Sequence, residues 1–177
     1  ALRARILFEQ GNTLRAIKEM MALDKRVKAK RWPYQTCVIE LHIGEMLLRI
    51  GEPAKAAFYV KRALRLARAM QAASLLGHGY LLQGLILSPV LQSSGAETGS
   101  GARAAAGNAA AAIERLEQAC QMPESSHQSE TAWRAHLELS RIFALFPESD
   151  KCREHAQKAY ELLCKAEDRV PSEMLPA

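Results

Sequence analysis

The chain has 177 residues, of which 49% are hydrophobic, 24% charged and only 6% aromatic, and its net charge is +5. No stretch reaches the roughly 18 consecutive apolar residues of a membrane-spanning helix, which argues against a membrane protein. The abundance of Ala, Leu, Arg, Glu and Lys is typical of helical proteins. The chain starts without Met inside a predicted helix, and no signal-peptide pattern follows, so we expect a fragment of a longer protein.

Two helices are predicted before residue 33. The first covers residues 2–10, and the second starts after the capping residue Asn12 and ends at Pro33, because proline cannot continue a helix. Trp32 and Tyr34 lie beside a basic run at the end of the second helix, made of Lys25, Arg26, Lys28, Lys30 and Arg31. Cations next to aromatic residues suit nucleic-acid binding. Cations at a helix C-terminus also complement the helix dipole while staying solvated, and we favour this second explanation.

The stretch 36–70 predicts a helical hairpin. Gly51 ends its first helix, because glycine enters the left-handed conformation without a steric penalty. Pro53 begins its second helix, at a position where a backbone N–H would have no partner. Gly44 on the first helix and Ala56 on the second are small enough to let the two backbones approach closely. We therefore expect these two residues to face each other.

Further helices are predicted in the second half of the chain. A helix over 73–87 precedes the segment 89–106, whose Gly-, Ser- and Ala-rich composition buries too little apolar area to offset the entropy of ordering. We expect this segment to be a flexible insertion, and an engineered linker or a regulatory loop are the alternatives. Helices are then predicted from about Asn108, over 131–144, and from a cap at Ser149 or Asp150 to about residue 168.

Small residues recur along the chain at a regular spacing. The anchor of each second helix is small and recurs as Ala16, Ala56, Ala112 and Cys152, which gives steps of 40, 56 and 40 in the numbering. The middle step equals one period plus a 16-residue insertion. The small residue of each first helix recurs as Ala4, Gly44, Gly84 and Ser140, and the turn glycine recurs as Gly11, Gly51 and Gly107. Because several positions recur in the same order and spacing, the sequence predicts a repeat of helix pairs.

A small residue in the first helix, Gly at the turn and Ala at the second helix's anchor resemble the tetratricopeptide repeat (TPR). The best match is IGEMLLRIGEPAKAAFYVKRAL, at residues 43–64, and GNTLRAIKEMMAL and GNAAAAIERLEQA match its second half. The resemblance implies an all-α fold, a right-handed solenoid of about four antiparallel helix pairs, as one domain over 1–177. Its units would cover about 1–32, 33–72, 73–122 and 127–168, with the insertion 89–106 inside the third.

The resemblance also implies a concave groove, lined by the first helix of each pair, that binds proteins or peptides. Aligning the chain on Gly44, Gly84 and Ser140 selects residues that lean toward this groove. They are Leu41, Glu45, Arg49, His78, Leu81, Leu85, Arg134, Leu137 and Arg141. We expect a partner segment with apolar anchors and acidic residues. Leu41, Leu81 and Leu137 could instead pack against the next hairpin.

No catalytic motif accompanies the repeat. The patterns HExxH, GxSxG, the P-loop and a dinucleotide fingerprint are missing from the sequence, so we predict neither an enzyme nor a cofactor. The four cysteines form no CxxC pair, and we interpret them as small buried residues in a reducing compartment, the cytoplasm or nucleus. Cys152 and His155 are one helical turn apart, but a structural zinc site needs about four ligands, so we predict no metal.

The predicted function is therefore a protein–protein interaction scaffold, as part of a larger protein or complex. Two alternatives stay open, because a fold does not determine a function. The first is a helical regulatory or sensor region of a multidomain enzyme or signalling ATPase. The second is a nucleic-acid-binding helical repeat that uses the net charge and the basic run.

Overall fold

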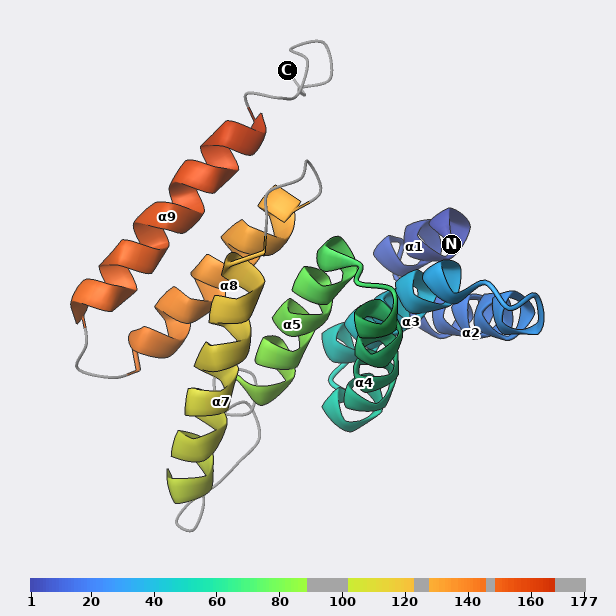
Figure 1. The fold of residues 1–177 in the computed structure, drawn as a ribbon, viewed down its shortest axis with the longest axis horizontal. Helices are drawn as coiled ribbons and strands as arrows, with labels where there is room; N and C mark the ends of the chain where they lie inside the picture. The colour runs from blue at the N-terminus through green and yellow to red at the C-terminus, as the bar shows by residue number, and fades with distance from the viewer. Residues whose placement is uncertain (89–101, 123–127, 146–148, 168–177) are drawn as a thin grey trace. The chain divides into compact units, whose positions relative to one another are not determined.

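A computed structural model of the chain describes residues 1–88, 102–122, 128–145 and 149–167. Within these ranges all regular secondary structure is helical (Figure 1). The helices are α1 (Leu2–Glu9), α2 (Thr13–Ala29), α3 (Pro33–Arg49), α4 (Pro53–Ala69), α5 (Ala73–Leu87), α7 (Ala102–Cys120), α8 (Gln128–Phe143) and α9 (Ser149–Glu167). The chain forms two compact units, Ala1–Leu82 and Gln83–Ala177, and each is described by itself.

Helices in the first unit begin at regular intervals. Helices α2, α3, α4 and α5 start at positions 13, 33, 53 and 73, a constant step of 20 in the numbering. The four turns between α1 and α5 each contain one residue with positive φ: Gly11, Arg31, Gly51 and Gln71. The amide of each bonds to the carbonyl three residues back, and the next amide bonds to the carbonyl five residues back, which is the Schellman pattern. Two such helix-and-turn elements make one predicted period.

Gly44 and Ala56 lie at a close contact between α3 and α4, as predicted. A Cβ atom on Gly44 would stand 2.7 Å from Val60 Cγ2 and 3.6 Å from the Ala56 carbonyl oxygen. Nearer the start of α3, the Cys37 thiol donates to the carbonyl oxygen of Ala63, 3.2 Å away. Gly44, late in α3, thus contacts the first half of α4. Cys37, early in α3, contacts Ala63 in the second half of α4. The two helices are therefore antiparallel.

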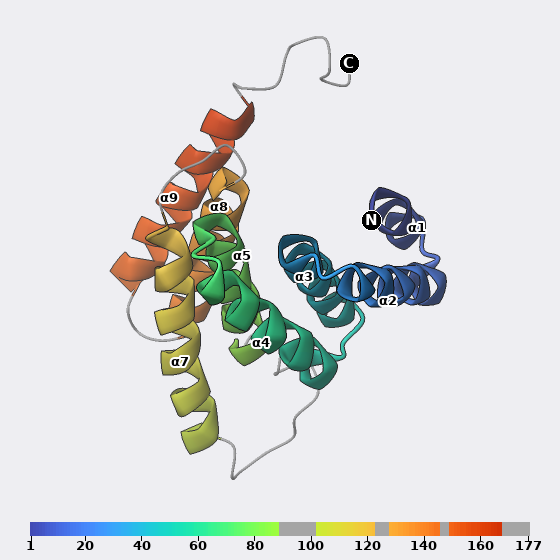
Figure 2. The same ribbon diagram turned by 45° about the vertical axis from the view of Figure 1, so that its right-hand side comes forward.

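The same small-residue contact recurs in the second unit, between α5 and α7. A Cβ atom on Gly84 would stand 2.5 Å from Leu116 Cγ and 3.4 Å from the Ala112 carbonyl oxygen. Gly84 is one period after Gly44, and Leu116 is one longer step, of 56, after Val60. This agreement confirms the predicted steps of 40 and 56. Helices α7, α8 and α9 lie side by side in succession, as Figures 1 and 2 both show.

Helix α7 begins earlier than the sequence indicated. It starts at Ala102, so residues 102–106 of the predicted insertion are helical, whereas residues 89–101 lie outside the described part of the chain. Gly107, predicted as a turn glycine, lies inside this helix. The physical reason is the alanine-rich context, because alanine has the highest helix propensity and one interior glycine costs only about 1 kcal/mol. Asn108 is therefore not the start of the helix.

Pro33 begins a helix instead of ending one. Helix α2 ends at Ala29, and Arg31 adopts the left-handed conformation with φ of 56° two residues later. Pro33 is then the first residue of α3, where its fixed φ suits the helix and its missing N–H costs nothing. Asn12 stands at the N-cap of α2 as predicted, but its side chain makes no capping hydrogen bond.

Candidate functional site: a basic pocket at the junction of α2, α3 and α4

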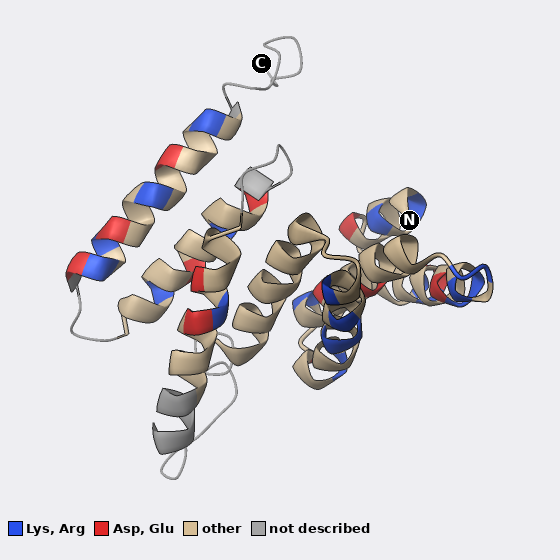
Figure 3. Cartoon of the chain, viewed as in Figure 1, with Lys and Arg blue, Asp and Glu red and all other residues tan. Residues whose placement is uncertain are grey.

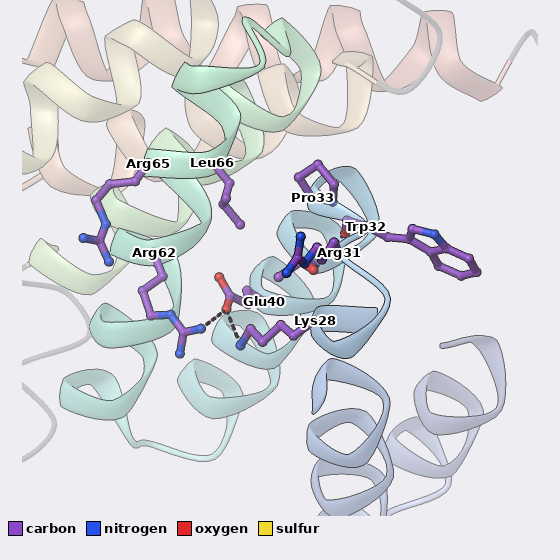
Figure 4. Close-up of a pocket in the computed structure, with 9 residues that line it drawn as sticks. Lys28, Arg31, Trp32, Pro33, Glu40, Arg62, Arg65 and Leu66 are labelled. Carbon is purple, nitrogen blue, oxygen red and sulfur yellow. Dashed lines mark hydrogen bonds and ion pairs between the residues drawn. The ribbon is translucent and has the colours of Figure 1, made fainter. Parts of the chain in front are cut away.

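A pocket of about 630 Å³ lies in the first unit, where the end of α2, the start of α3 and the second half of α4 meet (Figure 4). Its lining residues are Lys28, Arg31, Trp32, Pro33, Thr36, Glu40, Arg62, Arg65 and Leu66. The turn between α2 and α3 forms one side. Thr36 Oγ1 donates to the Trp32 carbonyl at 2.8 Å, which closes the first turn of α3 and holds this side in place.

Glu40 lies inside the pocket and is fully buried. Its Oε1 atom is 2.7 Å from Lys28 Nζ and 2.7 Å from Arg62 Nη2, and these two cations approach the carboxylate from two sides (Figure 4). Lys28 also pairs with Asp24, one turn earlier on α2. Its Oε2 atom has no hydrogen-bond partner among the described residues. The carboxylate is therefore charge-compensated through Oε1, while the described residues supply no donor to Oε2.

Packing of the repeat does not require this carboxylate. One period later, Arg68 and Tyr80 hold the positions of Lys28 and Glu40, and the Arg68 guanidinium carbon lies 6.0 Å from the centre of the Tyr80 ring. Burying an ion pair is often no better for stability than burying apolar side chains of similar volume. Glu40 is thus a feature of this junction and not of the repeat.

The pocket carries an excess of positive charge. Arg31 and Arg65 line it, and neither makes an ion pair with any residue that the structure describes. Helix α4 contains five Lys and Arg and no acidic residue, and Figure 3 shows these cations along it. Residues 1–82 carry 15 Lys and Arg against 6 Asp and Glu, a net charge of +9, whereas residues 83–177 carry 9 against 13, a net charge of −4. The positive field of the chain is concentrated around the first unit.

The predicted basic surface divides into two parts. Lys25, Arg26, Lys30 and Arg31 are exposed, while Lys28 is half-buried and directed toward Glu40. Trp32 and Tyr34 are exposed as well, and Lys30 Nζ lies 4.7 Å from the centre of the Trp32 ring. The indole of Trp32 points away from Glu40 (Figure 4). The exposed cations are available to a partner, whereas Lys28 belongs to the buried ion network.

Sequence reasoning missed Glu40, Arg62 and Arg65. A signal for Glu40 was present, because it lies three residues after Cys37 and four before Gly44, on the stripe of α3 that faces α4. An acidic residue on such a stripe must find a buried partner. The identity of that partner required the tertiary structure.

Leu41 and Leu81 were predicted to line a groove, and both are buried: 1% and 0% of their surfaces are exposed. They fill the interior of the first unit and offer no side-chain surface to a partner, which corrects their assignment. Glu45 and His78 stay half-exposed, with His78 Nε2 3.8 Å from Glu45 Oε2. Arg49 is exposed and pairs with Glu9, which lowers the pKa of the Glu9 carboxyl through a hydrogen bond.

The other predicted groove residues lie in the second unit. Leu85 and Leu137 are half-buried. Arg134 pairs with the exposed Glu130 at 3.4 Å, and Arg141 lies 3.5 Å from the buried carboxylate of Glu138. Arg141 is therefore exposed and at the same time a partner of a buried acid. A groove that continues through both units stays a prediction.

The cysteines and histidines of the described residues lie in partly or fully buried surroundings. Burial raises the pKa of the Cys37 thiol to about 11 and that of Cys120 to about 12, so both stay protonated at neutral pH. His155, considered as a partner of Cys152, instead lies 2.8 Å from His136, between their Nδ1 atoms. Within the described ranges, no group of three or more His, Cys, Asp or Glu could hold a metal ion.

Comparison with known proteins does not assign the chain to a family: no protein-family model matches it, and no curated protein matches it. Its class is therefore defined by its own fold and site. In its described residues the regular secondary structure is all-helical, and its first unit is built from evenly spaced helix-and-turn elements and carries a basic pocket at the junction of α2, α3 and α4. No described helix combines the length and apolarity needed to cross a bilayer.

Proposed function

We propose that the chain is a TPR-like helical repeat that binds partner proteins, as part of a larger protein or complex. In this proposal its helix pairs stack as a right-handed solenoid. The even spacing of helices α2 to α5 and the recurring contacts at Gly44 and Gly84 support it. A single helix pair cannot bury its apolar side alone, so stacked pairs share a core and leave an extended surface. Such a surface suits a macromolecular partner better than a small substrate.

The basic pocket is the observation that carries this proposal. It brings four cations together with one carboxylate on the surface of a repeat framework, and residues 1–82 add a net charge of +9 around it. A field of this sign raises the association rate of an acidic partner and orients it before contact. We propose no catalytic role. The four free cysteines suit a reducing compartment inside the cell.

Quantitative binding tests this function. The purified chain is used to capture proteins from a cell extract, each captured protein is expressed alone, and its affinity is measured by calorimetry at low and physiological salt. We expect a saturable complex whose affinity falls as salt rises, and whose protected segment on the partner is acidic. If no captured protein binds the purified chain, the proposed function is wrong.

Nucleic-acid binding is a second candidate, favoured by one specific observation. Trp32 and Tyr34 are 47% and 51% exposed beside the exposed cations Lys30 and Arg31. Exposed aromatic rings beside a basic groove are the components of a stacking platform for single strands. This function predicts binding to unrelated single-stranded sequences with similar affinity and a steep dependence on salt. Trp32→Ala should weaken that binding and leave an acidic protein partner nearly unaffected.

A further inference from the structure

Glu40, together with Arg31 and Arg65, which make no ion pair with any described residue, defines the chemistry of a ligand more closely than net charge does. Resting on the proposed function, we infer that this pocket binds an acidic segment of a partner protein. Arg31 and Arg65 take an Asp or Glu side chain of the segment, and Glu40 Oε2 accepts a hydrogen bond from one of its backbone N–H groups. This surface is distinct from the predicted groove.

The position of Glu40 separates the two surfaces. Helical residues five apart differ by about 140° around the axis, so Glu45, the groove residue on α3, projects from nearly the opposite side of that helix. Glu45 also has its own partners there, since its Oε2 lies 3.9 Å from His42 Nδ1 and 3.8 Å from His78 Nε2. The pocket is formed by residues of α2 and α4 around α3, which the groove prediction did not include.

Glu40 Oε2 is a buried acceptor to which the described residues supply no donor. A buried acceptor without a donor is costly, and buried polar atoms in folded proteins are nearly always bonded. Oε2 of Glu40 is buried, lies in a residue that lines the pocket, and has no donor among the described residues. A ligand that brings an N–H group into the pocket supplies the missing donor.

Charge determines which donor fits. Lys28, Arg31, Arg62 and Arg65 line the pocket against the single carboxylate of Glu40. A ligand ammonium group would add a further cation to this excess, whereas a neutral backbone N–H adds none. The remaining positive charge sits on Arg31 and Arg65, and arginine pairs well with a carboxylate through two parallel hydrogen bonds. A peptide with an acidic side chain supplies both groups.

The same chemistry disfavours a nucleic-acid backbone in this pocket. A phosphodiester backbone offers acceptor oxygens and negative charge but no N–H donor. Phosphate that reached Arg31 and Arg65 would approach the buried carboxylate of Glu40 and leave its Oε2 unsatisfied. Leu66 and Pro33 add apolar walls that suit the aliphatic part of a Glu side chain or a neighbouring leucine. The observations therefore favour a protein segment.

Anisotropy titration of the full chain tests the inference. The probe is a fluorescein-labelled peptide in which Glu and Leu alternate, and the comparison probes are the same peptide with Gln in place of Glu and a labelled oligothymidylate. The test variant is Arg31→Glu with Arg65→Glu. Its matched control is Lys18→Glu with Lys61→Glu, which changes net charge equally at two exposed residues of the same unit that do not line the pocket.

We expect the Glu–Leu peptide to bind, the Gln peptide to bind at least about ten-fold more weakly, and the test variant to lose at least about ten-fold in affinity. The control variant should stay within about two-fold. Methylation of the peptide's backbone nitrogens should weaken its binding to the wild type and should have little effect on Glu40→Leu, since that variant lacks the acceptor. Circular dichroism of each variant verifies folding.

Several results would overturn the inference. Equal losses in the test and control variants would mean that charge acts without a defined pocket, and failure of the Glu–Leu peptide to bind would remove the site. Tighter binding of oligothymidylate, abolished by the test variant, would assign the pocket to nucleic acid. A captured protein partner that binds the test variant with unchanged affinity would contradict this inference while leaving the proposed interaction function intact.

Discussion

The Nδ1 atoms of His136 and His155 lie 2.8 Å apart where α8 packs against α9. One of these nitrogens must donate a proton and the other must accept it, so the contact requires at least one neutral ring. Burial lowers the pKa of His136 to about 4, with His155 as a second cause, and burial also lowers the pKa of His155. Phe143 stacks on His155 with ring centres 5.5 Å apart, which adds to the apolar surroundings.

This histidine pair predicts that the chain loses stability in mild acid. Between the ordinary value of 6.5 and about 4, an unfolded His136 binds a proton that the folded one does not. The contribution of His136 to the free energy of unfolding is therefore complete above pH 6.5 and is lost as the pH drops toward 4. Urea unfolding across this range measures the effect. His136→Asn with His155→Asn should flatten the pH dependence, whereas His42→Gln should not, and an unchanged slope in the double variant would refute the assignment.

Gly44→Ala should destabilise the first unit. The added Cβ would stand 2.7 Å from Val60 Cγ2, and valine has little rotamer freedom with which to move away in a helix. Overpacking of this kind costs about 1–3 kcal/mol, partly offset by roughly 1 kcal/mol of helix propensity gained over glycine. Urea melts give the difference in unfolding free energy. Gly44→Ala combined with Val60→Ala is the control, since the smaller partner should make the alanine better tolerated.

The geometry of the turns predicts that one substitution lowers the stability of the chain and another raises it. Gly51 has φ of 77° and Gln71 has φ of 51°, and both stand directly after a helix C-cap. Left-handed conformation costs a residue with a Cβ about 1–2 kcal/mol, so Gly51→Ala should destabilise and Gln71→Gly should stabilise the chain by about 1 kcal/mol. Both residues are exposed, so neither substitution removes buried packing contacts and the two stability changes can be compared directly. Thermal melts of the two variants and their combination measure the effect; shifts of the same sign would contradict it.

Replacing Glu40 tests whether its ion network serves stability. Glu40→Leu alone leaves Lys28 and Arg62 facing each other without their shared carboxylate, and we expect a cost of about 3 kcal/mol. Lys28→Met, Glu40→Leu and Arg62→Met together remove the network and should recover most of that loss, because an apolar replacement is often neutral. Urea unfolding gives both values. A triple variant that is as unstable as the single one would show that the network itself stabilises the fold.

The sequence by itself determined the helical class, the register of the repeat and the residues at the close contacts. The 40-residue spacing of small residues revealed Gly44 and Gly84. Gly51 at the end of α3 and Pro53 at the start of α4 each act within one turn, so local steric rules reveal them without knowledge of the rest of the chain. The same rules failed at Gly107, because the alanines around it favour helix over a turn.

Only the tertiary structure decided where the basic pocket lies and which residues form it. Lys28, Glu40 and Arg62 belong to three different helices, so no helical periodicity relates them, and they meet because α2 and α4 both pack around α3. The tertiary structure also separated the predicted groove residues, because Leu41 and Leu81 are buried whereas Glu45 is partly exposed. The physical reason is that helical periodicity specifies the sides of one helix, whereas the neighbouring helices determine which sides are covered.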